Sequence, residues 1–140
     1  MDALDADVLI YAAVPGHELG RRVRALFPDE APDAADAPAG IGSVLLVPEL
    51  LTKPVRDGAD GEIRALAALL ARLELLPVDA ATADLAVALG AAHGLKAADA
   101  VHLATAVGAG ADRFLTNNHR DFPATIPEIA VTYPRDLPDP

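Results

Sequence analysis

Apolar residues follow two patterns along this 140-residue chain, and each pattern predicts one kind of element. Short apolar runs bounded by turn residues indicate strands, whereas apolar residues three and four positions apart indicate helices. Strands are expected at 3–5, 75–78, 113–116 and 129–133. Helices are expected at 17–27, at 41–56 after a short extended entry, and at 63–74, 80–93 and 97–107.

Three stretches fit these patterns less simply. Residues 8–14 form an apolar run that follows a turn and ends at a Pro-Gly turn signal. Pro48 either kinks the helix at 41–56 or marks the start of its regular part, and Ser43 is the candidate N-cap. Residues 28–40, PDEAPDAADAPAG, have no periodicity and are expected to form an exposed acidic loop.

Strands that alternate with helices are typical of an α/β protein with a mostly parallel sheet. The length matches one ordinary domain, so residues 1–140 are expected to form a single three-layer α/β/α sandwich with a flexible tail at 134–140. Binding sites in such sheets lie at the carboxyl ends of the strands. Asp5 ends the first expected strand, and Thr116, Asn117 and Asn118 close the strand near the C-terminus.

The composition narrows the classes of function. The chain is 52% hydrophobic, has a net charge of −10 and contains no cysteine. The absence of cysteine excludes disulfides, thiolate catalysis and cysteine-ligated zinc, and it fits a reducing cytoplasm. There is no secretory signal pattern and no apolar run of membrane-spanning length, so a cytoplasmic protein is expected. The acidity disfavours binding of nucleic acid by overall charge, although local charge can differ from the total.

Three acids interrupt apolar segments that belong to three different expected elements. Asp5 precedes the run at 8–14, Glu49 stands in SVLLVPELL, and Asp99 stands in LKAADAVHLATA. Each has an ordinary explanation, as a turn residue or as an acid in the first turn of a helix. Asp99, however, shares its helix face with His102 and with apolar positions. Buried carboxylates are costly unless they are paired or bind a metal.

Convergence of these three elements would bring three carboxylates together. Like charges at short range raise each other's pKa values and oppose folding. A hard divalent cation relieves this repulsion, and Mg²⁺ or Mn²⁺ prefers carboxylate oxygens as ligands. Zinc fits less well because the chain has no cysteine and only four histidines. We therefore expect Asp5, Glu49 and Asp99 to bind Mg²⁺ or Mn²⁺.

Four stretches, LDADVLIYA, SVLLVPELL, GLKAADAVHLATA and FLTNNHRDF, resemble motifs of the PIN-domain family. The likeness is to the VapC-like toxins of type II toxin–antitoxin pairs, and it spans nearly the whole chain in the family's order. The resemblance places the family's three acids at Asp5, Glu49 and Asp99. Many members carry a fourth acid two residues after the threonine, where this chain has Asn118. The fourth role is therefore open between Asn118 and Asp121.

The resemblance implies a metal-dependent endoribonuclease that cleaves RNA phosphodiester bonds with a metal-activated water. It also implies a cognate antitoxin as partner and a homodimer of this chain. The expected catalytic residues are Asp5, Glu49, Asp99, Asn118 and Asp121. Residues expected to orient water or a metal ligand from the outer side are Asp7, Ser43, Thr116 and Asn117. Candidates for binding the anionic RNA are Lys53, Arg56, Lys96, His119 and Arg120, and a second basic cluster is Arg21, Arg22 and Arg24.

Two other functions stay open at this level. A PIN-like module with weak or no catalysis could bind RNA or an antitoxin, and Asn118 in place of an acid favours that alternative. Idle acids on apolar faces argue against it, because they would destabilise the fold. A phosphatase with Asp5 as its nucleophile would also carry Asp-x-Asp after its first strand. It needs a catalytic lysine, for which only Lys53 and Lys96 are present.

Overall fold

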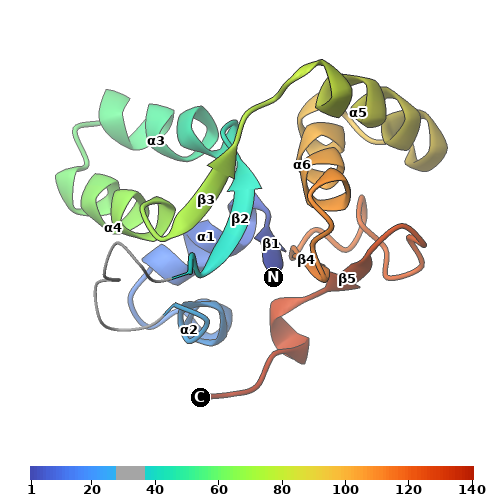
Figure 1. Cartoon of the computed structure of the whole chain (residues 1–140). Coiled ribbons are helices and arrows are strands. Elements are labelled where there is room, and N and C mark those ends of the chain that lie inside the picture. Colours follow the sequence, from blue (N-terminus) through green and yellow to red (C-terminus); the bar gives the residue numbers. More distant parts are fainter. Residues whose placement is uncertain (28–36) are drawn as a thin grey trace.

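The computed structural model describes residues 1–27 and 37–140, and its centre is a parallel sheet. The strands are β1 (Asp2–Leu4), β2 (Gly40–Ser43), β3 (Leu73–Leu76), β4 (Arg113–Leu115) and β5 (Ala130–Thr132). Their spatial order is β3-β2-β1-β4-β5, and each of the four neighbouring pairs is parallel (Figure 1). The expected α/β class with a parallel sheet is confirmed.

Helices cover both faces of this sheet (Figure 1). Along the chain they are α1 (Ala6–Ala13), α2 (Glu18–Arg24), α3 (Leu46–Arg56), α4 (Asp60–Leu70), α5 (Ala80–His93) and α6 (Ala97–Gly108), followed by the 3₁₀ turn η1 (Pro134–Asp136). The first four lie on one side of the sheet and α5 and α6 on the other, which gives three layers. In the described ranges, no helix combines the length and the apolar character needed to cross a membrane.

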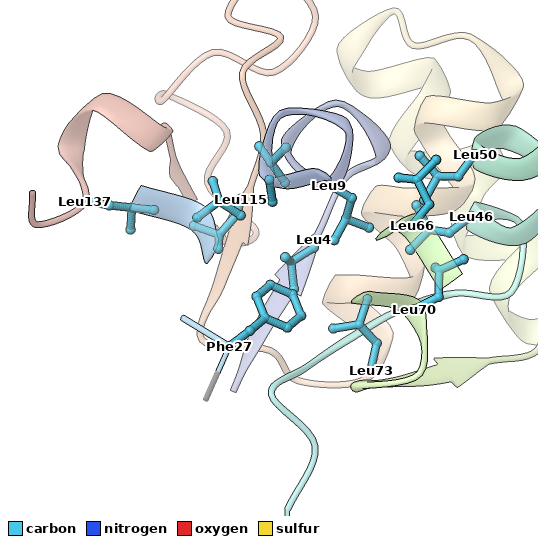
Figure 2. Packing of buried hydrophobic residues seen from close by; sticks show 13 residues of the cluster. Leu4, Leu9, Phe27, Leu46, Leu50, Leu66, Leu70, Leu73, Leu115 and Leu137 are labelled. Atoms are coloured by element: carbon cyan, nitrogen blue, oxygen red, sulfur yellow. The ribbon is translucent and has the colours of Figure 1, made fainter. Parts of the chain in front are cut away.

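The core consists of two apolar clusters, one on each face of the sheet. Neighbouring strand residues point to opposite faces, so Ala3 and Phe114 belong to the cluster beneath α5 and α6, whereas Leu4 and Leu115 belong to the other. Figure 2 shows this second cluster, in which leucines from α1, α3 and α4 pack against strand residues. The core therefore fixes the sheet between its helices and, with it, the positions of the strand ends.

The first helix of the structure comes from the apolar run at 8–14, to which the sequence pattern assigns no element. Strand β1 ends at Leu4, and Asp5 is the N-cap of α1, with its Oδ1 accepting a hydrogen bond from the Ala6 N–H at 2.8 Å. No turn follows near Asp7, which lies instead in the first turn of α1. Asp5 is thus one residue beyond the strand, at the junction with the helix.

The segment 41–56 divides into a strand and a helix. Its extended entry is β2, which pairs with both β1 and β3. Ser43 is not the N-cap of α3, because that helix is preceded by Leu45, but the Ser43 Oγ accepts a hydrogen bond from the Leu45 N–H at 3.1 Å. Pro48 lies in the first turn of α3, where its missing N–H has no helical partner to lose. The helix therefore needs no kink there.

Two further boundaries differ from the sequence pattern. The helix expected at 63–74 is α4, which begins three residues earlier and ends at Leu70, and Glu74 belongs to β3. The segment 134–140, expected to be a flexible tail, packs against α2. Leu137 is only 2% exposed, and Arg22 donates hydrogen bonds to the carbonyl oxygens of Arg135 and Leu137. Arg21 and Arg22 of the basic cluster on α2 thus hold the C-terminal segment, whereas Arg24 donates a hydrogen bond to the Ala12 carbonyl oxygen.

The last two expected helices and the expected acidic loop can also be compared with the structure. The helices expected at 80–93 and 97–107 are present as α5 and α6, and Gly94 ends the first of them in the left-handed conformation, with φ at 65°. Most of the acidic loop expected at 28–40 lies outside the described residues. Gly40, at its end, is part of β2.

Candidate active site

Polar residues gather at the carboxyl ends of β1, β2 and β4. Asp5 follows β1, Ser43 ends β2, and Thr116 follows β4. The chain leaves β1 toward β2 and β3 on one side and later returns to place β4 and β5 on the other. The boundary between β1 and β4 is therefore the point where the strand order reverses, which is where open α/β sheets form their sites.

Asp5 is the most enclosed acid of the site. It is 6% exposed, its Oδ1 accepts from the Ala6 N–H, and its Oδ2 accepts from the Thr116 hydroxyl at 2.8 Å. Burial raises the pKa of Asp5, and the neighbouring Glu49 carboxylate adds to this rise. The His102 ring and the two hydrogen bonds lower the pKa in opposition. The carboxyl group is therefore fixed in place and electrostatically tied to its neighbours.

Asp7 lies in the first turn of α1, beside this group. Its Oδ2 accepts a hydrogen bond from the Asn117 backbone N–H at 2.9 Å, whereas its buried Oδ1 has no hydrogen-bond partner among the described residues. Burial, and then repulsion from Asp5 and Asp99, raise its pKa to about 6. The site thus contains a buried carboxylate oxygen that no protein donor in the described ranges satisfies.

Glu49 approaches the same place from α3. Its side chain is 30% exposed, and its Oε2 lies 3.0 Å from the Nε2 of His102 on α6. His102 is 3% exposed, and its Nδ1 is buried without a hydrogen-bond partner in the described part of the chain. A hydrogen bond across 53 residues of sequence therefore joins α3 to α6 at the site.

Asp99 and Asp121 complete the acidic group. Asp99 is in the first turn of α6, and its pKa is raised by partial burial and by the carboxylates of Asp5, Asp121 and Glu49. Asp121 is half-buried in the segment that follows β4. The structure thus brings together Asp5, Asp7, Glu49, Asp99 and Asp121, all of which the sequence names as candidates.

The turn after β4 supports these acids through a chain of hydrogen bonds. The Thr116 hydroxyl donates to Asp5 and accepts from the Asn118 N–H at 3.1 Å. Asn118 and Asp121 bond reciprocally, because the Asn118 Nδ2 donates to the Asp121 Oδ2 at 2.9 Å and the Asp121 N–H donates to the Asn118 Oδ1 at 3.2 Å. Asn117 holds Asp7. Thr116, Asn117 and Asn118 therefore each position an acid.

The carboxylates are neighbours without being closed around a single point. In residues 1–27 and 37–140, no group of three or more Asp, Glu or His side chains is arranged to hold a metal ion. Both oxygens of Asp5 and one oxygen of Glu49 accept hydrogen bonds from protein donors. Ser43, 1% exposed, directs its hydroxyl oxygen to the Leu45 N–H beside this group.

The cationic candidates surround the acids on exposed positions. Lys53 and Arg56 are in the last turn of α3, with Lys53 one turn beyond Glu49, and Lys96 immediately precedes α6. Arg56 pairs with Asp57 at 3.6 Å. The exposed His119 stacks on Tyr133 with ring centroids 3.8 Å apart, and Arg120 is its exposed neighbour. No hydrogen bond or ion pair found among the described residues joins these five side chains to the acids.

His102 is a site residue that the sequence pattern names only because it shares a helix face with Asp99. In the structure it is packed, and its hydrogen-bond partner is Glu49. The available signal was its place three residues after Asp99, on the helix face that carries the acid. That spacing indicates the face and leaves the partner undetermined, since Glu49 comes from a distant segment.

Comparison with known proteins identifies the family to which this fold belongs. The PIN domain family model matches residues 3–125. A chain of a toxin–antitoxin complex from Klebsiella pneumoniae is similar at 25% identity and a TM-score of 0.74, covering 96% of this chain and 98% of that one. A chain of VapBC2 from Rickettsia felis, solved with a DNA fragment from its promoter, shares the fold at 19% identity and a TM-score of 0.69, covering 94% and 97%. No curated protein sequence matches significantly. With its fold and its family match over most of its length, this chain belongs to the PIN domain family, whose members are generally nucleases.

Proposed function

We propose that this protein is a Mg²⁺- or Mn²⁺-dependent endoribonuclease and the toxin of a toxin–antitoxin pair. The observation that carries the proposal is the group of five carboxylates where the strand order of a PIN domain reverses. Acids so close to each other raise one another's pKa values, which costs stability unless a cation binds. A structural role alone does not account for five acids at this edge.

The donors present suit a hard divalent cation. They are carboxylate oxygens, which Mg²⁺ and Mn²⁺ prefer, together with an amide oxygen on Asn118. The Oδ1 of Asp7, which has no hydrogen-bond partner in residues 1–27 and 37–140, supports the same assignment, because a buried oxygen beside other acids is well placed to accept from a water of a hydrated cation. We assign Asp5, Glu49 and Asp99 as the residues that would hold the ion. Their side chains would have to close further around it than they do here.

Each residue then has a defined task. A bound cation supplies an activated water and neutralises charge that develops on the scissile phosphate. Thr116 keeps the Asp5 carboxylate in one orientation, and Asn117 does the same for Asp7 through its backbone N–H. Asp121 is the better candidate for the fourth acid, since it brings charge close to Asp99 and Asn118 holds it by two hydrogen bonds.

An acidic protein must still hold an anionic substrate, and the exposed cations offer one way to do so. Lys53 belongs to α3, which carries Glu49, and Lys96 immediately precedes α6, which carries Asp99. His119 and Arg120 lie in the turn between Asn118 and Asp121. We propose that these four residues, with Arg56, contact RNA phosphates on either side of the cut. A site that meets phosphate through local cations does not need a basic protein overall.

The partner proposals rest on the similar structures. The chain from Klebsiella pneumoniae belongs to a toxin–antitoxin complex, and the chain from Rickettsia felis to a VapBC pair. We propose that this chain likewise binds a cognate antitoxin. We further propose that it forms a homodimer, as its resemblance to VapC-like toxins implies. A phosphatase that uses Asp5 as nucleophile is less well supported, because Asp5 is 6% exposed and both its oxygens already accept hydrogen bonds.

The test is cleavage of a fluorescently labelled RNA pool by purified protein with Mg²⁺, with Mn²⁺ and with EDTA. Asp5→Asn and Asp99→Asn are expected to lose metal-dependent cleavage and to remain folded by circular dichroism. Asp84→Asn, which removes an exposed acid of α5, is the matched control and keeps cleavage. Variants of the two site acids that cut as fast as wild type would refute the metal site. A folded wild type that never cuts with either metal would favour a binding module instead.

A further inference from the structure

The buried histidine of α6, His102, has one hydrogen-bond partner among the described residues, and that partner is an acid of the site. His102 is 3% exposed, and its Nε2 lies 3.0 Å from the Glu49 Oε2. Its other ring nitrogen is buried and has no partner among the described residues. Within that part of the chain, the hydrogen bonding of this ring is therefore directed at Glu49 alone.

The direction of the hydrogen bond follows from the chemistry of the pair. A carboxylate only accepts hydrogen bonds, so the Nε2 of His102 carries the hydrogen and donates it. A buried donor that loses its acceptor costs about 1–3 kcal/mol, which keeps the ring and the carboxylate together. Because the ring is enclosed, it does not reach a substrate that stays on the surface. His102 is thus suited to act on Glu49 and unsuited to act on RNA directly.

Glu49 is the acid of the site that most needs such support. Its side chain is long and 30% exposed, and ordering a glutamate costs up to about 2 kcal/mol in conformational entropy. Asp5 is held by two donors and Asp7 by one, whereas His102 provides the observed hydrogen bond to the Glu49 carboxylate. Glu49 nevertheless stays close enough to Asp5 and Asp99 to raise the pKa of each.

We propose that His102 is a positioning residue that holds the Glu49 carboxylate ready for the divalent cation and ties α3 to α6 at the site. The inference rests on the metal centre proposed above. A hydrogen-bonded partner behind a metal ligand fixes the ligand's orientation, and its loss commonly weakens metal binding about 10- to 100-fold. A purely structural tie between the helices would stabilise the fold and leave the metal affinity of the folded protein unchanged.

Two substitutions of His102 distinguish the effect of its hydrogen-bond donor from the effect of its packing. In His102→Gln the side-chain amide places an N–H near the position of Nε2, whereas His102→Leu fills similar space without a donor. Mn²⁺ affinity is measured by isothermal titration calorimetry without RNA, on protein shown to be folded. We expect His102→Leu to weaken Mn²⁺ binding about 10-fold or more and His102→Gln to stay within about threefold of wild type. Should the leucine variant not fold, His102→Asn, whose shorter amide does not reach Glu49, replaces it.

A double-mutant cycle decides whether His102 acts through Glu49. If it does, His102→Leu has no further effect on Mn²⁺ affinity in a Glu49→Ala protein. Equal losses in both backgrounds would overturn the inference, as would a His102→Leu protein that binds Mn²⁺ like wild type. If wild type itself binds no Mn²⁺, the proposed metal centre falls together with the inference. The cleavage assay then shows whether the nuclease proposal fails as well.

Discussion

The half-buried Asp7 carboxyl predicts a specific pH dependence of the free energy of unfolding. Folding raises its pKa from the ordinary 3.8 to about 6, chiefly through burial and next through repulsion from Asp5. The folded protein therefore binds this proton more tightly than the unfolded chain does. The stabilisation that protonated Asp7 gives to the folded protein is fully present below pH 3.8, and it is lost as pH rises through about 6. The whole difference corresponds to about 3 kcal/mol, at about 1.4 kcal/mol for each pH unit.

Asp7→Asn removes this titration and little else. The amide oxygen can still accept from the Asn117 N–H, and the amide nitrogen takes the place of an oxygen that has no described partner. Replacing the oxygen by nitrogen also changes the free energy of unfolding by an amount that does not depend on pH. The quantity to follow is the free energy of unfolding of the variant minus that of wild type. We expect this difference to increase by about 1.5 kcal/mol from pH 5.0 to pH 7.5, which is half of the whole difference of about 3 kcal/mol. The variant thus becomes more stable relative to wild type as pH rises.

Urea denaturation in EDTA at several pH values measures this difference without a metal ion. Asp84→Asn is the control, because it removes one negative charge from an exposed position of α5. A difference between Asp7→Asn and wild type that stays constant from pH 5.0 to 7.5 would refute the assignment of a strained, buried carboxyl. A difference that runs the opposite way would mean that Asp7 is stabilised as an anion in the folded protein.

Three further substitutions test the support of the site and the packing of the C-terminal segment. Thr116→Val keeps the shape of a fully buried side chain but removes the donor to Asp5 and the acceptor for Asn118, so urea denaturation should show a loss of about 1–3 kcal/mol together with slower RNA cleavage. Leu137→Ala opens the cluster shown in Figure 2 and should cost about 2–5 kcal/mol in the same assay. Asp139→Asn, which breaks an exposed ion pair with Arg21, should cost less than about 1 kcal/mol.

The sequence was most informative where an element carries a regular apolar pattern. Helices α5 and α6 follow their expected ranges closely, since alanine and leucine repeat at helical spacing and Gly94 ends the first of them. Strand β2 was less visible, because two of its four residues are glycines. A Cβ at Gly42 would lie 2.4 Å from the Leu46 Cδ1, and one at Gly40 would lie 2.7 Å from the Leu4 Cδ1. Close packing therefore requires glycine at both positions, and the strand is left with too few side chains to show an apolar pattern.

The acids of the site were predictable for a related reason, and their partners were not. An acid within an apolar segment stands out among its neighbours, so the sequence alone is enough to name Asp5, Glu49 and Asp99. The contact between Glu49 and His102 depends instead on how β2 and β4 flank β1, and no local pattern encodes it. The same holds for Asp7, whose bond to the Asn117 N–H joins the first helix to the turn after β4.

The proposed function requires an acidic protein to act on an anionic substrate. Burial and repulsion raise the pKa values of Asp5, Asp7 and Asp99, so the site without a cation is an unfavourable place for negative charge. A divalent cation would relieve that repulsion, and it would also attract a phosphate that the net charge of −10 repels. The same ion would then stabilise the enzyme and recruit its substrate. The excess of acids is therefore compatible with RNA cleavage, provided that exposed cations such as Lys53 and Lys96 hold the flanking phosphates.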